Sequence, residues 1–276
     1  MHAPRSEPLI EAELLMLAYR SGIFPMADSR DDAEIFWIEP RLRAILPLDK
    51  FRLSHSLART LRRGRFTVTC NQAFERVMDE CAAPRPVNDA SADGAAANSG
   101  SWISHRIQAS YVNLHFLGRA HSIEVWNQEG ELVGGLYGVG FDRAFCGESM
   151  FSRESDTSKV ALAWLVAALR RAGVTVLDCQ FLTPHLESLG AVEIPQKRYL
   201  RMLQAAQGPL AYSASGVAES EALGVDDGEA AGDGEAVAAD VLALPDAFLA
   251  LLEAAAEAGL SSSPGKLIAQ DLIHTS

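Results

Sequence analysis

Residues 145–181 read FCGESMFSRESDTSKVALAWLVAALRRAGVTVLDCQF, and this stretch decides the fold. Its middle part, from Asp156 to Arg171, repeats apolar residues at helical spacing and ends just before Gly173, which predicts a long helix with one apolar face. Polar and apolar side chains alternate before and after it, in FCGESM and VLDCQF, as they do in strands. The sequence therefore predicts a strand over 144–149, the long helix, and a second strand over 174–182.

The elements around this unit predict an α+β fold. Upstream, strands over His121–Trp126 and Leu132–Gly138 form an antiparallel meander with residues 144–149. The same patterns predict helices over 11–20, 54–63, 71–81, 104–117 and 184–189, and short strands over 35–38, 44–48, 66–70 and 192–201. This order predicts a mixed, largely antiparallel sheet, and it resembles the acyltransferase fold of the GNAT superfamily.

Two segments differ in composition from the rest. Residues 83–101 hold Ala, Asn, Ser, Gly and Pro in an order that suits no packed element, which predicts a mobile surface loop. From Gly208 onward the chain is rich in Ala, Gly, Asp and Glu, and this predicts disorder over 208–240. A further helix is compatible with residues 247–258.

The formal net charge of −12 is unevenly distributed. Residues 202–265 contain eleven acids and no Lys or Arg, whereas residues 1–201 contain 24 acids and 23 bases. Lys50 to Arg65 holds six bases and no acid. Because a phosphate backbone responds to local charge, the bulk acidity does not exclude a nucleic-acid partner.

The spacing of the cysteines and the hydropathy of the chain limit the classes of protein to which it can belong. The four cysteines are far apart, and no CxxC pair or Cys/His group with zinc spacing occurs, so we expect neither a disulfide framework nor a structural metal. The N-terminus lacks a signal-peptide pattern, and no apolar stretch reaches the ~20 residues that span a bilayer. We expect a soluble cytoplasmic protein.

Polar residues on the two strands of the central unit are candidates for chemistry. Asp178 and Gln180 share one face of their strand by alternation, and Glu148 lies beside Met150 on the other strand. Such residues must be hydrogen-bonded or functional if buried, although most polar strand residues simply face water. The pattern alone therefore favours a structural role.

Two other features each allow two interpretations. Trp102, in the run SWIS, and Tyr111 could stack on a base, but aromatics are more often core anchors. Four arginines could bind phosphates, but a run of charge is usually a solvated helix face: Arg59, Arg62, Arg63 and Arg65.

Taken together, these motifs match one family. The runs GIFPM, FWIEP, SWIS, HSIEVW, LVGGLYGV, FCGESMFSRESDTSK, LDCQFLTPHLESLGA and EIP-x(3)-Y occur in this order between about Leu14 and Arg201. They closely resemble the bacterial leucyl/phenylalanyl-tRNA protein transferases. The resemblance implies a small N-terminal domain over 1–41 and a GNAT-like catalytic domain over 42–207. Residues 208–276 then form an acidic, largely disordered tail without a counterpart in the family.

The resemblance also implies an activity. The family transfers Leu, Phe and, less well, Met from aminoacyl-tRNA to the N-terminal amine of proteins that begin with Lys or Arg. The new N-terminus marks these proteins for degradation through the N-degron pathway. The family uses no metal and no acetyl-CoA, so no cofactor is expected, and we expect a monomer with aminoacyl-tRNA and acceptor proteins as its partners.

Site residues carry over by matching motif. The resemblance implies that Asp178, Gln180 and Glu148 are catalytic, and we hypothesise that Asp178 dominates by holding the acceptor amine. Met26, where many relatives carry Trp, is placed with Trp102 and Tyr111 around the terminal adenosine, and the four arginines named above match the tRNA-binding cluster. The amino-acid pocket is expected to be apolar and lined by Leu136, Phe145, Gly147, Met150, Leu162, Leu165 and Leu177.

Four other functions fit parts of the sequence. An acetyl-CoA-dependent enzyme usually carries a glycine-rich turn before the long helix, but FSRESDTSK contains no glycine. A non-catalytic RNA-binding protein has no need of the strand carboxylates. A cysteine hydrolase would use Cys146 or Cys179, and alternation directs Cys179 away from Asp178 and Gln180. A leucyl-transferase that acts on acidic N-termini remains open, because acceptor choice depends on pocket geometry.

Overall fold

The computed structural model describes residues 8–84, 101–207 and 243–273, and its centre is a seven-stranded sheet. The strands lie in the order β4-β5-β6-β7-β8-β3-β9. Their bounds are β3 Leu42–Ile45, β4 Thr67–Cys70, β5 Ala120–Trp126, β6 Leu132–Phe141, β7 Ala144–Ser152, β8 Val176–Gln180 and β9 Val192–Pro195. Among these described strands β7 and β8 pair in parallel, and the other neighbours pair antiparallel. The predicted mixed, largely antiparallel sheet is confirmed.

The central strand–helix–strand unit is also confirmed. Helix α5 (Thr157–Arg171) connects β7 to β8, as a parallel pair requires. It lies very close to the meander, since a Cβ at Gly134 of β6 would come within 2.4 Å of the Thr157 side chain. Glycine at this position therefore lets the start of α5 rest directly on the sheet.

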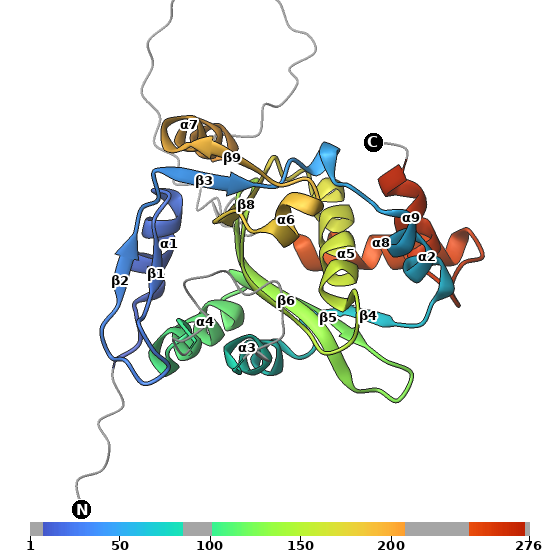
Figure 1. The fold of residues 1–276 in the computed structure, drawn as a ribbon, viewed down its shortest axis with the longest axis horizontal. Coiled ribbons are helices and arrows are strands. Elements are labelled where there is room, and N and C mark those ends of the chain that lie inside the picture. The colour runs from blue at the N-terminus through green and yellow to red at the C-terminus, as the bar shows by residue number, and fades with distance from the viewer. Residues whose placement is uncertain (1–7, 85–100, 208–242, 274–276) are drawn as a thin grey trace, which may run out of the picture.

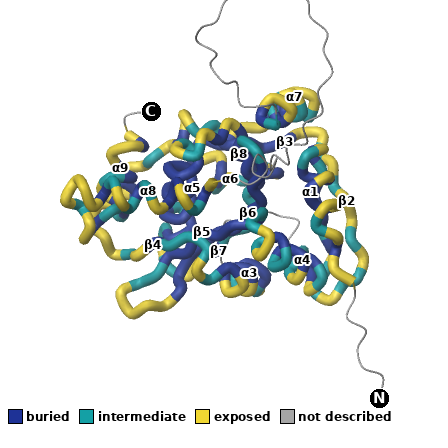
Figure 2. Tube along the Cα trace, turned by 180° about the vertical axis from the view of Figure 1, so that it is seen from behind, coloured by how far each residue is buried: buried dark blue, intermediate teal, exposed yellow. Residues whose placement is uncertain are grey.

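The end of the chain covers the outer side of α5. Helices α8 (Leu244–Glu257) and α9 (Gly265–Ile273) contact α5, and α9 also contacts α2 (His55–Arg63) (Figure 1). Trp164 of α5 lies 5.2 Å from Phe248 of α8, measured between ring centroids. As a result α5 is buried on nearly all sides (Figure 2). Residues 243–273 of the segment expected to be a largely disordered tail thus include two helices that pack on α5, while 208–242 lie outside the described residues.

A second hydrophobic cluster lies on the other face of the sheet. It is covered by α1 (Ala12–Arg20), α3 (Phe74–Ala82), α4 (His105–Phe116) and α7 (Gln196–Ala206). Helix α1 is followed by a two-stranded antiparallel sheet, β1 (Phe24–Met26) with β2 (Phe36–Ile38). Figure 1 shows this N-terminal unit at the opposite end of the molecule from α8 and α9.

Two strand predictions need correction. The expected strand over 192–201 ends at Pro195, and α7 begins at Gln196 because its apolar residues Tyr199, Leu203 and Ala206 recur at helical spacing. The strand expected over 44–48 is β3, which begins earlier and is followed by a 3-10 turn over Leu48–Lys50. The predicted loop over 83–101 falls almost wholly outside the described residues. No helix of the described part is long and apolar enough to span a bilayer.

Candidate active site

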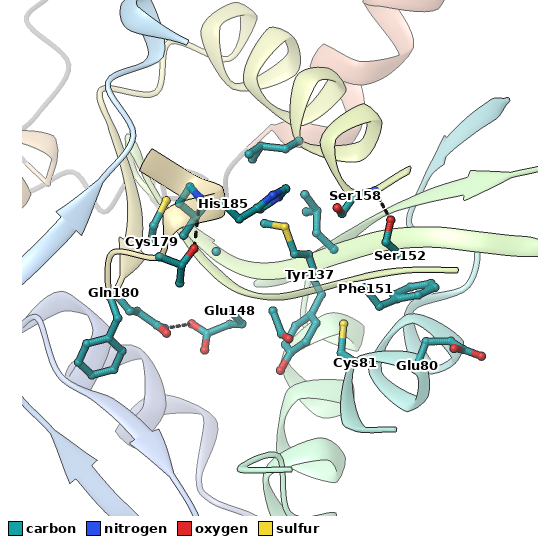
Figure 3. Close-up of a pocket in the computed structure, with 18 of the residues that line it drawn as sticks. Glu80, Cys81, Tyr137, Glu148, Phe151, Ser152, Ser158, Cys179, Gln180 and His185 are labelled. Carbon is teal, nitrogen blue, oxygen red and sulfur yellow. Dashed lines mark hydrogen bonds between the residues drawn. The ribbon is translucent and has the colours of Figure 1, made fainter. Parts of the chain in front are cut away.

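The site lies where β7 and β8 stop pairing. The parallel pairing runs from Ala144↔Val176 to Cys146↔Asp178 and then ends. The next residues, Gly147 on β7 and Cys179 on β8, line a pocket of about 270 Å³. Figure 3 shows this pocket between the two strand ends, below helix α5 and above α3.

One wall of the pocket is aliphatic. It consists of side chains from β6, β7, α5 and β8: Leu136, Met150, Leu162, Leu165 and Leu177. These residues and Gly147 were all expected at an amino-acid pocket. Phe145, which was also expected there, is fully buried in the core cluster instead and does not line the pocket. An aliphatic wall of this kind suits a large apolar side chain.

The opposite part of the pocket is polar and centres on Glu148. The side-chain amide of Gln180 donates a hydrogen bond of 2.9 Å to Glu148 Oε1, drawn as a dashed line in Figure 3. Tyr19 donates to the same oxygen at 2.8 Å, and Tyr111 donates to Glu148 Oε2 at 3.4 Å. The carboxylate is held by neutral donors, and within the described ranges it forms no ion pair.

Burial dominates the titration of Glu148. It raises the pKa of this carboxyl from 4.5 to about 7, although the hydrogen bonds from Tyr19 and Gln180 act in the opposite direction. The group is therefore close to half ionised at neutral pH. A carboxyl of this kind can accept or return a proton at a reacting centre.

Asp178 has different surroundings. Arg43 donates from Nε to Oδ1 at 2.9 Å and from Nη2 to Oδ2 at 2.5 Å, and Tyr199 donates to Oδ2 at 2.9 Å. Both members of the ion pair are buried, with 1% of the Arg43 side chain and 0% of the Asp178 side chain exposed. Asp178 does not line the pocket. Asp178 is therefore not in a position to contact a ligand in the pocket. This differs from the expectation that it holds the acceptor amine.

Asp178 contacts the site through the backbone of Gln180. Its Oδ1 accepts the Gln180 N–H at 2.8 Å, and Gln180 has a φ of 61°, in the left-handed region that non-glycine residues rarely adopt. This turn ends β8 and directs the Gln180 amide to Glu148. Asp178 and Gln180 therefore do not share one face as regular strand alternation predicted, because only Gln180 lines the pocket.

The residues expected around the adenosine separate into two groups. Met26 of β1 and Trp102 both line the pocket, and the Trp102 carbonyl accepts the Ala27 N–H at 3.2 Å. Tyr111 is fully buried behind Glu148, and its hydroxyl is hydrogen-bonded to that of Tyr19. Of the three, Met26 and Trp102 can contact a ligand in the pocket.

The basic residues lie on and after α2. Leu57 and Leu61 face the core, whereas the basic side chains are exposed and none lines the pocket: Arg59, Arg62, Arg63 and Arg65. Ser54 caps the start of α2 by accepting the Leu57 N–H at 3.2 Å, and Gly64 ends it with a left-handed cap. Arg65 lies 3.7 Å from Glu154.

The cysteines do not support nucleophilic catalysis. Cys179 lines the pocket, and strand alternation places its side chain on the opposite face of β8 from Asp178. Burial raises the pKa of the Cys179 thiol well above its ordinary value. Burial also raises the pKa of Cys146. Both thiols are therefore protonated at neutral pH. The described part of the chain contains no cluster of His, Cys, Asp and Glu suited to a metal ion.

Comparison with known proteins decides the family. Residues 45–204 match the leucyl/phenylalanyl-tRNA protein transferase family, and residues 9–41 match its N-terminal domain. A leucyl/phenylalanyl-tRNA protein transferase of Novosphingobium aromaticivorans is 62% identical over 99% of both chains. The chain belongs to the leucyl/phenylalanyl-tRNA protein transferase family. It is an aminoacyltransferase.

Further relatives of the same name are shorter matches. The transferase of Rhizorhabdus wittichii is 54% identical over 73% of this chain and 77% of its own, and one from Rhodopseudomonas palustris is 52% identical over 74% and 87%. A solved structure titled "The structure of L-PGS from Bacillus licheniformis" aligns with a TM-score of 0.34 at 15% identity, over 62% of this chain and 50% of that chain. That similarity is too weak to support an argument about the transferase.

The sequence did not predict several residues of this candidate site. Arg43 and Tyr199 hold Asp178, and Tyr19 of the N-terminal unit reaches Glu148. The sequence held a signal for a partner of Asp178, because a carboxylate buried on a central strand is costly unless it is paired or hydrogen-bonded, but this signal did not single out Arg43. Tyr19 had no such signal, since its partner is more than a hundred residues away. The pocket wall also includes Thr183 and His185, for which no role was expected.

Proposed function

We propose that this transferase moves Leu or Phe, and less well Met, from aminoacyl-tRNA to the N-terminal α-amine of proteins that begin with Lys or Arg. The new N-terminus marks the acceptor for N-degron degradation in the cytoplasm. The observation that carries this proposal is the pocket, in which an aliphatic wall faces the buried Glu148–Gln180 pair. We also assign the catalytic domain to a GNAT-like fold, because its parallel strands β7 and β8 separate beside a long helix that follows a meander.

The aliphatic wall supports the choice of amino acid. It contains leucines and a methionine but no charged group, so it offers apolar contact to Leu and Phe side chains. A polar side chain would leave its hydrogen-bonding groups unpaired there, which is costly. Met is accommodated less well because its unbranched chain loses more rotamer freedom on burial.

The polar part of the pocket supports the chemistry. The aminoacyl ester is already activated, so attack by an amine requires positioning and a proton acceptor and no covalent enzyme intermediate. The amine nitrogen bonds to the ester carbonyl carbon, the bond to the tRNA ribose oxygen breaks, and the nitrogen proton passes to Glu148 and then to that oxygen. The pKa of Glu148, about 7, suits both the uptake and the release of this proton.

Gln180 and Asp178 have different parts in this scheme. Gln180 lines the pocket and fixes Glu148 through its side-chain amide, while its carbonyl oxygen is available to the acceptor ammonium. Asp178 is a positioning residue, because it reaches the pocket only by holding the backbone of Gln180. Glu148 and Gln180 are therefore the catalytic residues in our proposal.

Two surfaces bind the tRNA. The terminal adenosine lies against Met26 and Trp102 at the pocket edge, where sulfur and an indole ring offer polarizable contacts. The phosphate backbone lies on the exposed arginines of α2. Met26 gives weaker contact than an aromatic residue would, so Trp102 carries most of the stacking.

The test is transfer of labelled Phe or Leu from charged tRNA to two reporter peptides that differ in one residue, Arg or Glu at the N-terminus. Transfer to the Arg peptide alone supports the proposal. Transfer to the Glu peptide alone shows a leucyl-transferase for acidic N-termini, and transfer to neither excludes both acceptor classes.

A matched pair of variants tests the tRNA surface. The triple variant Arg59→Ala, Arg62→Ala and Arg63→Ala should raise the KM for charged tRNA. It should also lower the slope of log Kd against log salt by about one for each arginine removed. Glu75→Ala, on the exposed surface of α3, should change neither.

A further inference from the structure

The α8–α9 hairpin lies beyond the residues that the family model matches, although the Novosphingobium aromaticivorans relative aligns over nearly the whole chain. The match to the family model ends at residue 204, and the hairpin occupies 244–273. It nevertheless shares one core cluster with the basic helix, since Ile268 and Leu272 of α9 belong to the same cluster as Leu57 and Leu61 of α2. The apolar side of α2 therefore rests partly on the end of the chain.

The closest contact is at the C-terminal end of α2. Ser263 donates a hydrogen bond of 3.1 Å from Oγ to the carbonyl of Arg62. Gly265, at the start of α9, is packed so closely that a Cβ there would lie 2.5 Å from the Leu61 carbonyl oxygen. Both contacts are to backbone groups of the last turn of α2, the turn that carries Arg62 and Arg63. The hairpin thus fixes the position and the end of the basic helix.

A short helix benefits from such support. Helix α2 has nine residues, and isolated helices of this length are marginal in water. A site for a phosphate backbone binds more tightly when its side chains are already ordered, because less conformational freedom is lost on binding. The hairpin supplies that order at the end of α2 that holds most of its charge.

The hairpin carries one basic side chain, Lys266, at the end of α9 that packs on α2, although its other charged residues are acids. Lys266 is the one Lys or Arg in residues 202–276, although this stretch has twelve acids. It is exposed and follows Gly265 directly, so it extends the basic surface beside the end of α2. Asp271, the acid of α9, lies more than one helical turn further along.

We propose that the α8–α9 hairpin is part of the tRNA-binding surface of this enzyme: it holds the last turn of α2 in place through Ser263 and Gly265, and it contributes Lys266 as a further contact to the phosphate backbone. This inference rests on the proposed role of α2 in binding tRNA. It assigns a binding role to a segment whose overall composition is acidic.

The experiment measures binding of Phe-charged tRNA to the full chain across a range of salt concentrations. Gly265→Ala should displace α9 from Leu61 and weaken binding about tenfold, equivalent to about 1.4 kcal/mol, and Ser263→Ala should weaken it by a smaller factor. Lys266→Ala should lower the slope of log Kd against log salt by about one. The control is Gln270→Ala, on the exposed side of α9, which should bind as the unaltered chain does. Circular dichroism of each variant establishes that it is folded.

The outcomes separate this inference from the function on which it rests. If the triple arginine variant of α2 weakens binding while Gly265→Ala, Ser263→Ala and Lys266→Ala leave it unchanged, the inference is overturned and the role of α2 stands. If the triple variant has no effect, both are overturned. A variant with Asn and Gln at the eight acids of 208–242 tests charge alone. Tighter binding after deletion of 208–276 than in this charge variant would also overturn the inference, because it would mean that the hairpin opposes the tRNA.

Discussion

Two carboxylates on adjacent strands have opposite surroundings. Asp178 on β8 accepts hydrogen bonds from Arg43, Tyr199 and the backbone of Gln180, so its charge is neutralised where it is buried. Glu148 on β7 is also buried, with 8% exposed, but its donors are uncharged. A cation beside a buried carboxylate offsets the cost of burying its charge, whereas burial without a cation raises the pKa of the carboxyl, as it does for Glu148. The difference therefore separates an anchor from a group able to exchange protons.

The largest expected effect follows from removing Arg43, the cation that pairs with Asp178. Arg43→Met leaves Asp178 buried and unpaired, so we expect a loss of about 3–5 kcal/mol in the free energy of unfolding, measured with urea. Adding Asp178→Asn to the same chain should restore most of it, since the uncompensated charge is then gone. If Arg43→Met alone were as stable as the unaltered chain, Asp178 would not depend on this ion pair.

The link between the two carboxylates is tested at Gln180. Gln180→Gly suits the observed φ of 61° and removes the side chain, so it should keep the fold and lower the rate of transfer by about 100-fold. Gln180→Ala also removes the amide but keeps the Cβ that Gln180 already carries in this conformation, so it should be less stable than Gln180→Gly. A Gly variant that transfers Phe at the normal rate would show that the Gln180 amide is not needed to hold Glu148.

The smallest expected effect concerns the titration of Glu148. Because its pKa is raised from 4.5 to about 7, the folded chain binds more protons than the unfolded chain between these values. Its contribution to stability is therefore full below about pH 4.5 and falls as the pH rises towards 7. The Glu148→Gln side chain does not ionise, so this loss of stability with rising pH is absent from the variant.

We expect the Glu148→Gln variant to be more stable than the unaltered chain by about 1–3 kcal/mol at pH 8 and to show little gain at pH 5. Thermal unfolding at the two pH values measures this difference. The same variant should lose transfer activity at both, whereas activity of the unaltered chain should rise with pH through about 7. An equal stability gain at pH 5 and pH 8 would contradict the raised pKa.

The fold was predictable where local pattern and packing agree. The central helix and the meander follow directly from apolar periodicity, and the aliphatic wall was expected except for Phe145. Helix α9 was missed because no element was assigned after residue 258, in a tail whose composition predicted disorder over 208–240 and one compatible helix over 247–258. The helix after Pro195 was missed because EIP was extended as a strand, although Tyr199 and Leu203 are four residues apart.

The polar part of the site was less predictable. The prediction from alternation along β8 assumes a regular strand backbone. Gln180 has a positive φ, and a positive φ at a non-glycine residue cannot be predicted from the sequence pattern. The partners of Asp178 and Glu148 come from β3, α7 and α1, so only the tertiary fold brings them together. The matched motif singled out both carboxylates, but it did not show which of them lines the pocket.

The hydrogen bond from Tyr19 to Glu148 has a consequence for how the two domains work together. Tyr19 belongs to the N-terminal unit, and its hydrogen bond lowers the pKa that burial raises. A Tyr19→Phe variant would lose this donor while keeping the buried aromatic ring, so the pKa of Glu148 should rise and, in the proposed mechanism, the pH optimum should move upward. In the proposed mechanism, proton exchange at Glu148 thus depends on a donor from the N-terminal unit as well as on the strands that form the pocket.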